Sequence, residues 1–148
     1  MLILGWSDDV RSFIDFSLVF KILDLVIFSC FFTIEQIFEK CASVSITGNE
    51  FLNAQFEELK HKSPTSLKIS LKQIRDASKM SLKDELIMEY RMVQRCLEIG
   101  DFFEGVRAML VDKDRKPNWK PSTIQDVDES RVNKFFESLE DLDLILTN

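Results

Sequence analysis

The chain has 148 residues, a net charge of −6 and 45% hydrophobic residues. This length predicts one domain with a modest core, and the apolar content is too high for a disordered chain. An acidic total disfavours general nucleic-acid binding, which needs Lys and Arg to neutralise phosphates. The charge is uneven, however, with −6 over residues 1–59, +4 over 60–100 and −4 over 101–148. With only three prolines and four glycines, we expect helices throughout.

Residues 1–32 carry an apolar stripe at helical spacing. It consists of Phe13, Phe16, Phe20, Leu23 and Ile27. Charges at Asp15, Lys21 and Asp24 interrupt the segment, and each would cost roughly 2.5 to 3.5 kcal/mol at the centre of a membrane span. Asp8 and Asp9 lie where a signal or transit peptide would carry positive charge. We therefore expect an amphipathic helix that needs a partner surface, no membrane span and no visible targeting peptide.

Two helices are predicted next, over residues 34–40 and 49–62. Thr33 and Gln36 have the spacing of a capping box, in which two side chains and two backbone N–H groups bond reciprocally at a helix start. The second helix directs Leu52, Phe56 and Leu59 inward. The Ser63-Pro64 step ends it, because the residue before proline avoids helical backbone angles.

A further helix begins at Pro64, which suits a first helical turn, with Ser63 as its cap. Its predicted core face carries Leu67, Leu71 and Ile74. A basic row at helical spacing consists of Lys68, Lys72, Arg75 and Lys79. Such a row is most often a solvated face. The alternative is contact with phosphates, either of a small ligand or of RNA.

A long helix and a shorter one are predicted over residues 82–98 and 102–111. Ser81 with Asp84 marks the first start. Apolar residues then recur every three or four positions at Leu82, Leu86, Tyr90, Val93 and Leu97. Gly100 suits the left-handed residue that ends a helix, and Asp101 with Glu104 has capping-box spacing. The two helices should therefore meet at a fixed corner. A terminal helix from Asp128 to about Leu139 would bury Val132, Phe135, Phe136 and Leu139.

The segment between these helices is a charged loop. Asp112 and Asp114 alternate with cations, which favours a salt-bridged loop over a metal site or an acid/base dyad. Pro117 and Pro121 keep the backbone extended across the surface. Trp119 lies between them, and an indole in such a place more often seals a core edge than contacts a ligand.

Little else in the sequence points to chemistry. Cys30, Cys41 and Cys96 are odd in number and widely spaced, which indicates free thiols and neither disulfides nor a metal site. His61 has no nucleophile or orienting acid nearby in the sequence, so a surface position at a helix end is expected. The sequence contains no P-loop, HExxH or GxSxG motif. We predict no catalytic residue and no metal ligand in this chain.

Several motifs in order resemble the C-terminal region of the 3-hydroxyisobutyryl-CoA hydrolases, within the enoyl-CoA hydratase/isomerase (crotonase) superfamily. They are SPTSLKIS at 63–70, MEYR at 88–91, DFFEGVRA at 101–108, and DKD followed by PNW within 112–119. Ordered motifs are more specific than any single short pattern. The resemblance implies an all-α fold of five to six helices, with 1–32 as a divergent apolar helix and 33–148 as the hydrolase-like helical domain.

The resemblance also implies what the chain lacks and what it contacts. In the family, a spiral β/α core with the oxyanion-hole glycine and catalytic acids precedes this region. Coenzyme A enters as part of the substrate, not as a resident cofactor. Lys113 matches a lysine near the nucleotide end of coenzyme A if one inserted residue is allowed, whereas Met109 replaces the family's phenylalanine. Asp101, Glu104, Gly105, Arg107 and Trp119 match structural signature positions.

Two functions follow as expectations. The first is CoA thioester hydrolysis in valine breakdown, in mitochondria or in plant peroxisomes, with this chain as a part that is inactive alone and packs on a crotonase-like core. The second is a non-catalytic hydrolase-like protein with a structural or assembly role, such as a component of a mitochondrial ribosome. The basic row and the phenylalanine stripe would serve the second, although nucleic-acid binding is disfavoured by the overall charge.

Overall fold

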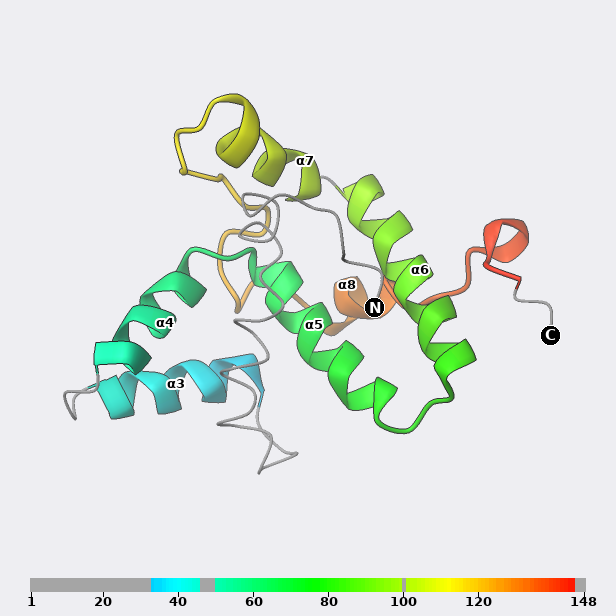
Figure 1. The fold of residues 1–148 in the computed structure, drawn as a ribbon, viewed down its shortest axis with the longest axis horizontal. Coiled ribbons are helices and arrows are strands. Elements are labelled where there is room, and N and C mark those ends of the chain that lie inside the picture. The colour runs from blue at the N-terminus through cyan, green and yellow to red at the C-terminus, as the bar shows by residue number, and fades with distance from the viewer. Residues whose placement is uncertain (1–32, 46–49, 100, 146–148) are drawn as a thin grey trace. The chain divides into compact units, whose positions relative to one another are not determined.

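The computed structural model describes residues 33–45, 50–99 and 101–145. Over these ranges the chain forms six α-helices and no β-strand (Figure 1). The α-helices are α3 (Ile34–Ser45), α4 (Glu50–Lys60), α5 (Pro64–Ala77), α6 (Leu82–Ile99), α7 (Asp101–Val106) and α8 (Glu129–Lys134). A π-helical turn, η1 (Arg107–Val111), continues α7, and a 3-10 turn, η2 (Glu140–Leu142), follows α8. The predicted all-α fold of five to six helices is confirmed for this part of the chain.

The chain divides into two compact units. One contains Met1–Lys62 and Phe103–Asn118, and the other contains Ser63–Phe102 and Trp119–Asn148. The predicted helix over residues 1–32, with its phenylalanine stripe, lies outside the described residues. The predicted domain boundary after residue 32 falls at their edge and stays a prediction.

In the first unit, local polar bonds start α3 and apolar contacts join it to α4. Thr33 N donates to Gln36 Oε1 at 2.8 Å, and Gln36 N donates to Thr33 Oγ1 at 3.3 Å. This is the predicted capping box. The rings of Phe38 and Phe56 then meet edge to face, with centroids 5.5 Å apart. The buried apolar residues of the two helices are Ile34, Ile37, Phe56 and Leu59.

In the second unit, α5 begins as the sequence predicts. Pro64 occupies the first turn, and Ser63 Oγ accepts a hydrogen bond from Ser66 N at 3.1 Å. Leu67 and Leu71 are buried, as are the neighbouring residues Thr65, Ile69 and Ser70. The buried face of α5 is therefore broader than the predicted stripe.

The long helix α6 buries a different face from the one its apolar pattern indicates. Met88 and Met92 are buried and join a core cluster with Ile69, Val127, Val132 and Phe135. The sequence stripe lies elsewhere on the helix, since Leu82 is 72% exposed, Val93 56% and Leu97 39%. The helix thus has two apolar faces, and the methionine face is the one that packs into this core.

The terminal helix is shorter than predicted. Asp128 caps it as expected, with its Oδ1 accepting from Arg131 N at 2.6 Å. The helix ends at Lys134 rather than near Leu139, because Phe135 N and Phe136 N bond to carbonyls three residues back and tighten the last turn. Phe135 is only 2% exposed.

Beyond α8 the chain is tied to α6 by one ion pair. Both oxygens of Asp143 accept hydrogen bonds from Arg91, with Nε at 2.8 Å from Oδ1 and Nη2 also bonded to Oδ2. Ser138 Oγ donates to the same carboxylate at 3.0 Å. The guanidinium lowers the pKa of Asp143 to about 2, and the same bond raises the pKa of Arg91. The sequence motif MEYR therefore supplies an anchor for the C-terminal segment.

Replacing Phe135 by alanine should destabilise the second unit by about 3 to 5 kcal/mol, because a buried ring is lost and a cavity remains. Urea unfolding of the chain and of Phe135→Ala would measure the difference. Leu142→Ala is the matched control, since Leu142 is 75% exposed and its change should stay within about 0.5 kcal/mol. Equal effects of the two substitutions would contradict the assigned core.

The Arg91–Asp143 pair predicts a specific acid titration. Because the folded pKa of Asp143 lies below its ordinary value of 3.8, the pair stabilises the fold above that value and is lost as the pH falls towards 2. NMR titration of the Asp143 carboxyl should give a midpoint near 2. Arg91→Met should move it back towards 3.8, whereas Arg95→Met, on the same helix but paired with Glu98, should leave it unchanged. A midpoint insensitive to Arg91→Met would refute the pairing.

Candidate functional site

The residues of the DFFEGVRA and DKD motifs converge on a single guanidinium. Arg107 begins η1, and the wider π turn places Asp112 N on Arg107 O at 2.8 Å. Such turns are rare and occur often at functional sites. The turn leads directly into the charged loop, so the side chain of Arg107 lies where the loop folds back over it.

Four groups accept hydrogen bonds from the Arg107 side chain. Nε and Nη2 bond to the two oxygens of Glu104 at 2.9 and 2.8 Å. Nη1 bonds to Asp112 at 2.6 Å and to Asp114 at 2.8 Å. Nη2 also bonds to Lys116 O at 3.1 Å. The prediction of a salt-bridged loop is therefore confirmed, with Arg107 as the cation.

These bonds shift the pKa values of Arg107 and Asp114. The three carboxylates, Glu104 first, raise the pKa of Arg107. Arg107 lowers the pKa of Asp114, and the backbone N–H of Lys116 adds to that effect. Charge-assisted bonds of this forked kind fix geometry as well as charge. Arg107 thus favours the ionised form of Asp114, which leaves that carboxyl unsuited to work as a general acid.

The backbone of the loop follows from the same arrangement. Lys113 and Arg115 have φ of 57° and 55°, in the left-handed region. Arg115 N donates to Ala108 O at 3.0 Å, and Lys116 N donates to Asp114 Oδ1 at 2.8 Å. Asn118 N closes the loop on Glu104 Oε1 at 2.6 Å. The loop is therefore fixed at both ends and in its middle.

With its acids turned to Arg107, the loop presents its cations outward. The side chains of Lys113, Arg115 and Lys116 are all exposed. Lys113 thus lies on a fixed, accessible loop, as a ligand-contacting residue would, and its contact with coenzyme A stays a prediction.

The remaining signature residues lie in or beside α7 and in the second unit. Asp101 accepts from Ser63 Oγ at 2.6 Å and from Lys120 N at 3.2 Å. Arg131 donates to Thr65 Oγ1 at 3.3 Å and to Lys120 O at 2.8 Å. Asp101 and Arg131 therefore tie the start of α5 to the loop before α8. Gly105 is buried and Trp119 half-buried, and the Lys120–Pro121 peptide is cis.

Cys41 and Cys96, the two thiols that the structure describes, lack the properties of a nucleophile, and Cys30 lies outside the described residues. Burial raises the pKa of Cys41, and burial together with the charge of Asp101 raises the pKa of Cys96 to about 11. Neither therefore carries much thiolate near neutral pH. Within the described ranges no group of His, Cys, Asp and Glu side chains could hold a metal ion. His61 is exposed just after α4, as expected.

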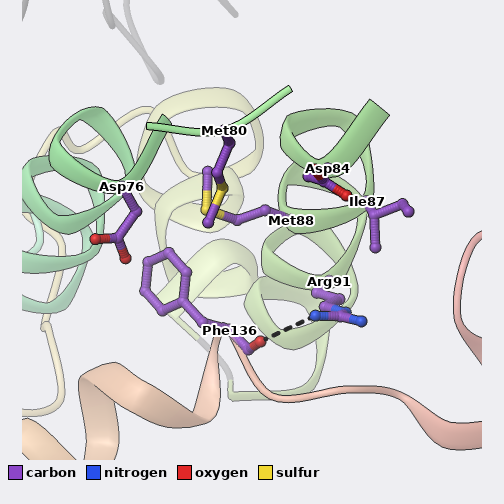
Figure 2. Close-up of a pocket in the computed structure, with 7 residues that line it drawn as sticks. All are labelled: Asp76, Met80, Asp84, Ile87, Met88, Arg91 and Phe136. Carbon is purple, nitrogen blue, oxygen red and sulfur yellow. Dashed lines mark hydrogen bonds between the residues drawn. The ribbon is translucent and has the colours of Figure 1, made fainter. Parts of the chain in front are cut away.

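A shallow hollow lies in the second unit between the end of α5 and α6 (Figure 2). It is lined by Asp76, Met80, Asp84, Ile87, Met88, Arg91 and Phe136. Its volume is about 200 Å³, below the roughly 300 to 1,000 Å³ of ordinary ligand sites. Arg91 is occupied by Asp143 and by the Phe136 carbonyl, the latter at 3.5 Å. The hollow is too small to enclose an acyl-CoA.

The basic row lies on α5 except for Lys79, which follows the helix, and it is partly used inside the chain. Lys68 Nζ donates to Val127 O at 2.8 Å, and Lys72 Nζ bonds to Asp76 at 2.8 Å while lying 4.9 Å from the Phe136 ring centroid. These two cations therefore have structural partners. Among the helices that the structure describes, none is long and apolar enough to cross a membrane.

Removing the Arg107 guanidinium should release the loop. In Arg107→Ala the carboxylates of Asp114 and Glu104 lose their orienting partner, so the amides of Lys116 and Asn118 should exchange hydrogen roughly tenfold faster. Arg115→Ala is the matched control, because Arg115 has an exposed side chain in the same loop. Unchanged exchange in Arg107→Ala would show that the backbone alone holds the loop.

Comparison with known proteins gives a consistent set of relatives. The family model described as "Enoyl-CoA hydratase/isomerase" matches residues 19–136. The mitochondrial 3-hydroxyisobutyryl-CoA hydrolase of Mus musculus is 46% identical over 118 residues, which cover 78% of this chain and 30% of the mouse protein. That of Homo sapiens is 43% identical over 118 residues, with coverage of 78% and 30%. The chain thus spans about 30% of the length of these relatives.

Solved structures agree with the sequence relatives. A carnitinyl-CoA dehydratase from Mycobacterium thermoresistibile superposes with a TM-score of 0.66 at 31% identity, covering 76% of this chain and 31% of that one. An enoyl-CoA hydratase from Rhodobacter sphaeroides gives 0.64 at 26% identity, with coverage of 72% and 32%. The helical fold is therefore that of part of a crotonase-like protein, and the chain belongs to the enoyl-CoA hydratase/isomerase family.

Proposed function

We propose that this chain is the C-terminal helical part of a 3-hydroxyisobutyryl-CoA hydrolase, which cleaves a CoA thioester in valine breakdown. The observation that carries the proposal is the 46% identity over 118 residues to the mouse hydrolase. The relatives are named mitochondrial, and we propose the same location for this protein.

In this role the chain supports the reaction without performing its chemical step. The Arg107-centred loop holds Lys113 on an accessible, fixed backbone, and we propose that its ammonium contacts a phosphate at the nucleotide end of coenzyme A. The acids and the oxyanion hole belong to the upstream part of the family fold. We further propose that the helices pack over that upstream part, with the phenylalanine stripe of residues 1–32 among the contacting surfaces.

An assembly role is the second candidate, and the basic row of Lys68, Lys72, Arg75 and Lys79 is the feature that suggests it. Lys68 and Lys72 already bond to Val127 O and Asp76. An RNA phosphate would therefore have to compete with these internal partners. The internal bonds of Lys68 and Lys72 therefore weigh against this second candidate.

The test is a graft of residues 19–136 into the mouse hydrolase in place of the matching segment. We expect the chimera to release free coenzyme A from 3-hydroxyisobutyryl-CoA, measured by chromatography, because the helices should restore packing around the mouse core. The isolated chain should release none. A chimera that folds, by circular dichroism and thermal unfolding, yet is inactive would contradict the proposal, as would turnover by the isolated chain.

Within an active chimera, Lys113→Ala should raise KM about fivefold to tenfold and leave kcat unchanged, because a phosphate contact far from the thioester contributes equally to ground and transition states. Arg115→Ala is the control, since it removes a neighbouring exposed cation from the same loop. Equal KM changes in both variants would indicate general electrostatic attraction and would remove the specific role of Lys113.

A further inference from the structure

Lys113 lies between two acids in the sequence, with Asp112 before it and Asp114 after it. The side chains of both acids are partly exposed, at 51% and 39%, and Lys113 is exposed as well. A free carboxylate next to Lys113 would attract its ammonium and repel an approaching phosphate. A lysine in this sequence context therefore needs another group to keep its neighbours from competing with an anionic ligand.

Arg107 supplies that group through one nitrogen atom. Its Nη1 donates to Asp112 Oδ2 at 2.6 Å and to Asp114 Oδ2 at 2.8 Å. The acids on both sides of Lys113 are thus bonded to a single atom, and the chain between them turns through the left-handed backbone of Lys113, with φ of 57°. The two flanking charges are therefore held on the guanidinium, whereas the side chain of Lys113 is exposed.

The guanidinium of Arg107 has no donor left for a ligand. An arginine side chain carries five N–H groups, and those of Arg107 make five hydrogen bonds within the chain. Two of these bonds go to Glu104, and one each goes to Asp112, Asp114 and the carbonyl of Lys116. Arg107 therefore acts on a ligand through the residues that it holds and not by direct contact.

The charge of the loop also depends on Arg107. Residues 112–116 contain two acids and three cations, and Glu104 and Arg107 add one charge of each sign. Together these residues carry one positive charge in excess with Arg107 and none without it. An excess of positive charge favours the approach of a phosphate. Loss of Arg107 would thus free two carboxylates beside Lys113 and remove that excess at the same time.

We propose that Arg107 is a positioning residue for the phosphate contact of Lys113, because it holds the two neighbouring carboxylates away from the ammonium. The inference rests on the proposed function, which supplies a coenzyme A phosphate as the ligand. It adds to that function the reason why a lysine between two acids can bind an anion. The acids themselves are then part of the device, since their bonds to Arg107 fix the turn that carries Lys113.

The test uses the chimera of residues 19–136 in the mouse hydrolase. Arg107→Gln should raise KM for 3-hydroxyisobutyryl-CoA about threefold to tenfold and leave kcat unchanged, because the freed carboxylates weaken a contact far from the thioester. Adding Asp112→Asn and Asp114→Asn should return KM to within about twofold of the original, since amides carry no charge. Arg95→Gln is the matched control. It removes another arginine bonded to a carboxylate, at 2.7 Å, and should leave KM unchanged.

The outcomes separate this inference from the proposed function. A folded but inactive chimera overturns both, and a KM insensitive to Lys113→Ala removes the phosphate contact together with the role of Arg107. If Lys113→Ala raises KM but Arg107→Gln does not, or if KM stays high after the two Asn substitutions, the positioning role alone is overturned.

A second comparison leaves Arg107 in place, so it decides the matter even if Arg107→Gln does not fold. Asp112→Asn with Asp114→Asn in the parent chimera should change KM by less than about twofold, because Arg107 already holds both acids. Thermal unfolding checks that each variant is folded. A several-fold fall in KM would show that the acids compete with the phosphate despite Arg107, and would overturn the proposal.

Discussion

The fork of N–H donors on Arg107 determines the shape of the loop that follows α7. Residues 112–116 are all exposed, so no apolar anchor holds them. Three carboxylates and one carbonyl bond to the same guanidinium instead. These bonds offset the conformational cost of the left-handed backbone at Lys113 and Arg115. That cost is about 1 kcal/mol for each residue other than glycine. A lysine at position 107 could not replace this planar fork, because a single ammonium cannot reach acceptors spread over so wide an arc.

Features set by neighbouring residues could be predicted from the sequence. The caps at Thr33, Ser63 and Asp128 need only a few residues of context, and each forms as expected. The salt-bridged loop was also predictable, because Asp112 and Asp114 lie close in sequence to the cation that binds them. What the spacing could not supply was the identity of that cation, since Lys113 and Arg115 are nearer in sequence than Arg107 but point outward.

Features that join distant segments were beyond local patterns. Arg91 and Asp143 are 52 residues apart, and nothing in MEYR identifies its partner. The same limit explains α6, which carries apolar residues on two faces. Periodicity detects the helix but cannot choose between the faces, because the choice depends on Ile69 and Phe135 from other elements. The family, by contrast, could be predicted from the sequence, because several motifs in a fixed order identify a family more specifically than helical periodicity does.

The left-handed backbone at Lys113 and Arg115 also limits how these positions can drift during evolution. Glycine and asparagine enter that region easily, and unbranched side chains enter it at moderate cost. Valine and isoleucine are excluded by their branched Cβ atoms. The backbone therefore restricts which residue types can occupy these two positions, whether or not a ligand binds there. A lysine at such a position carries a conformational penalty that a glycine would avoid.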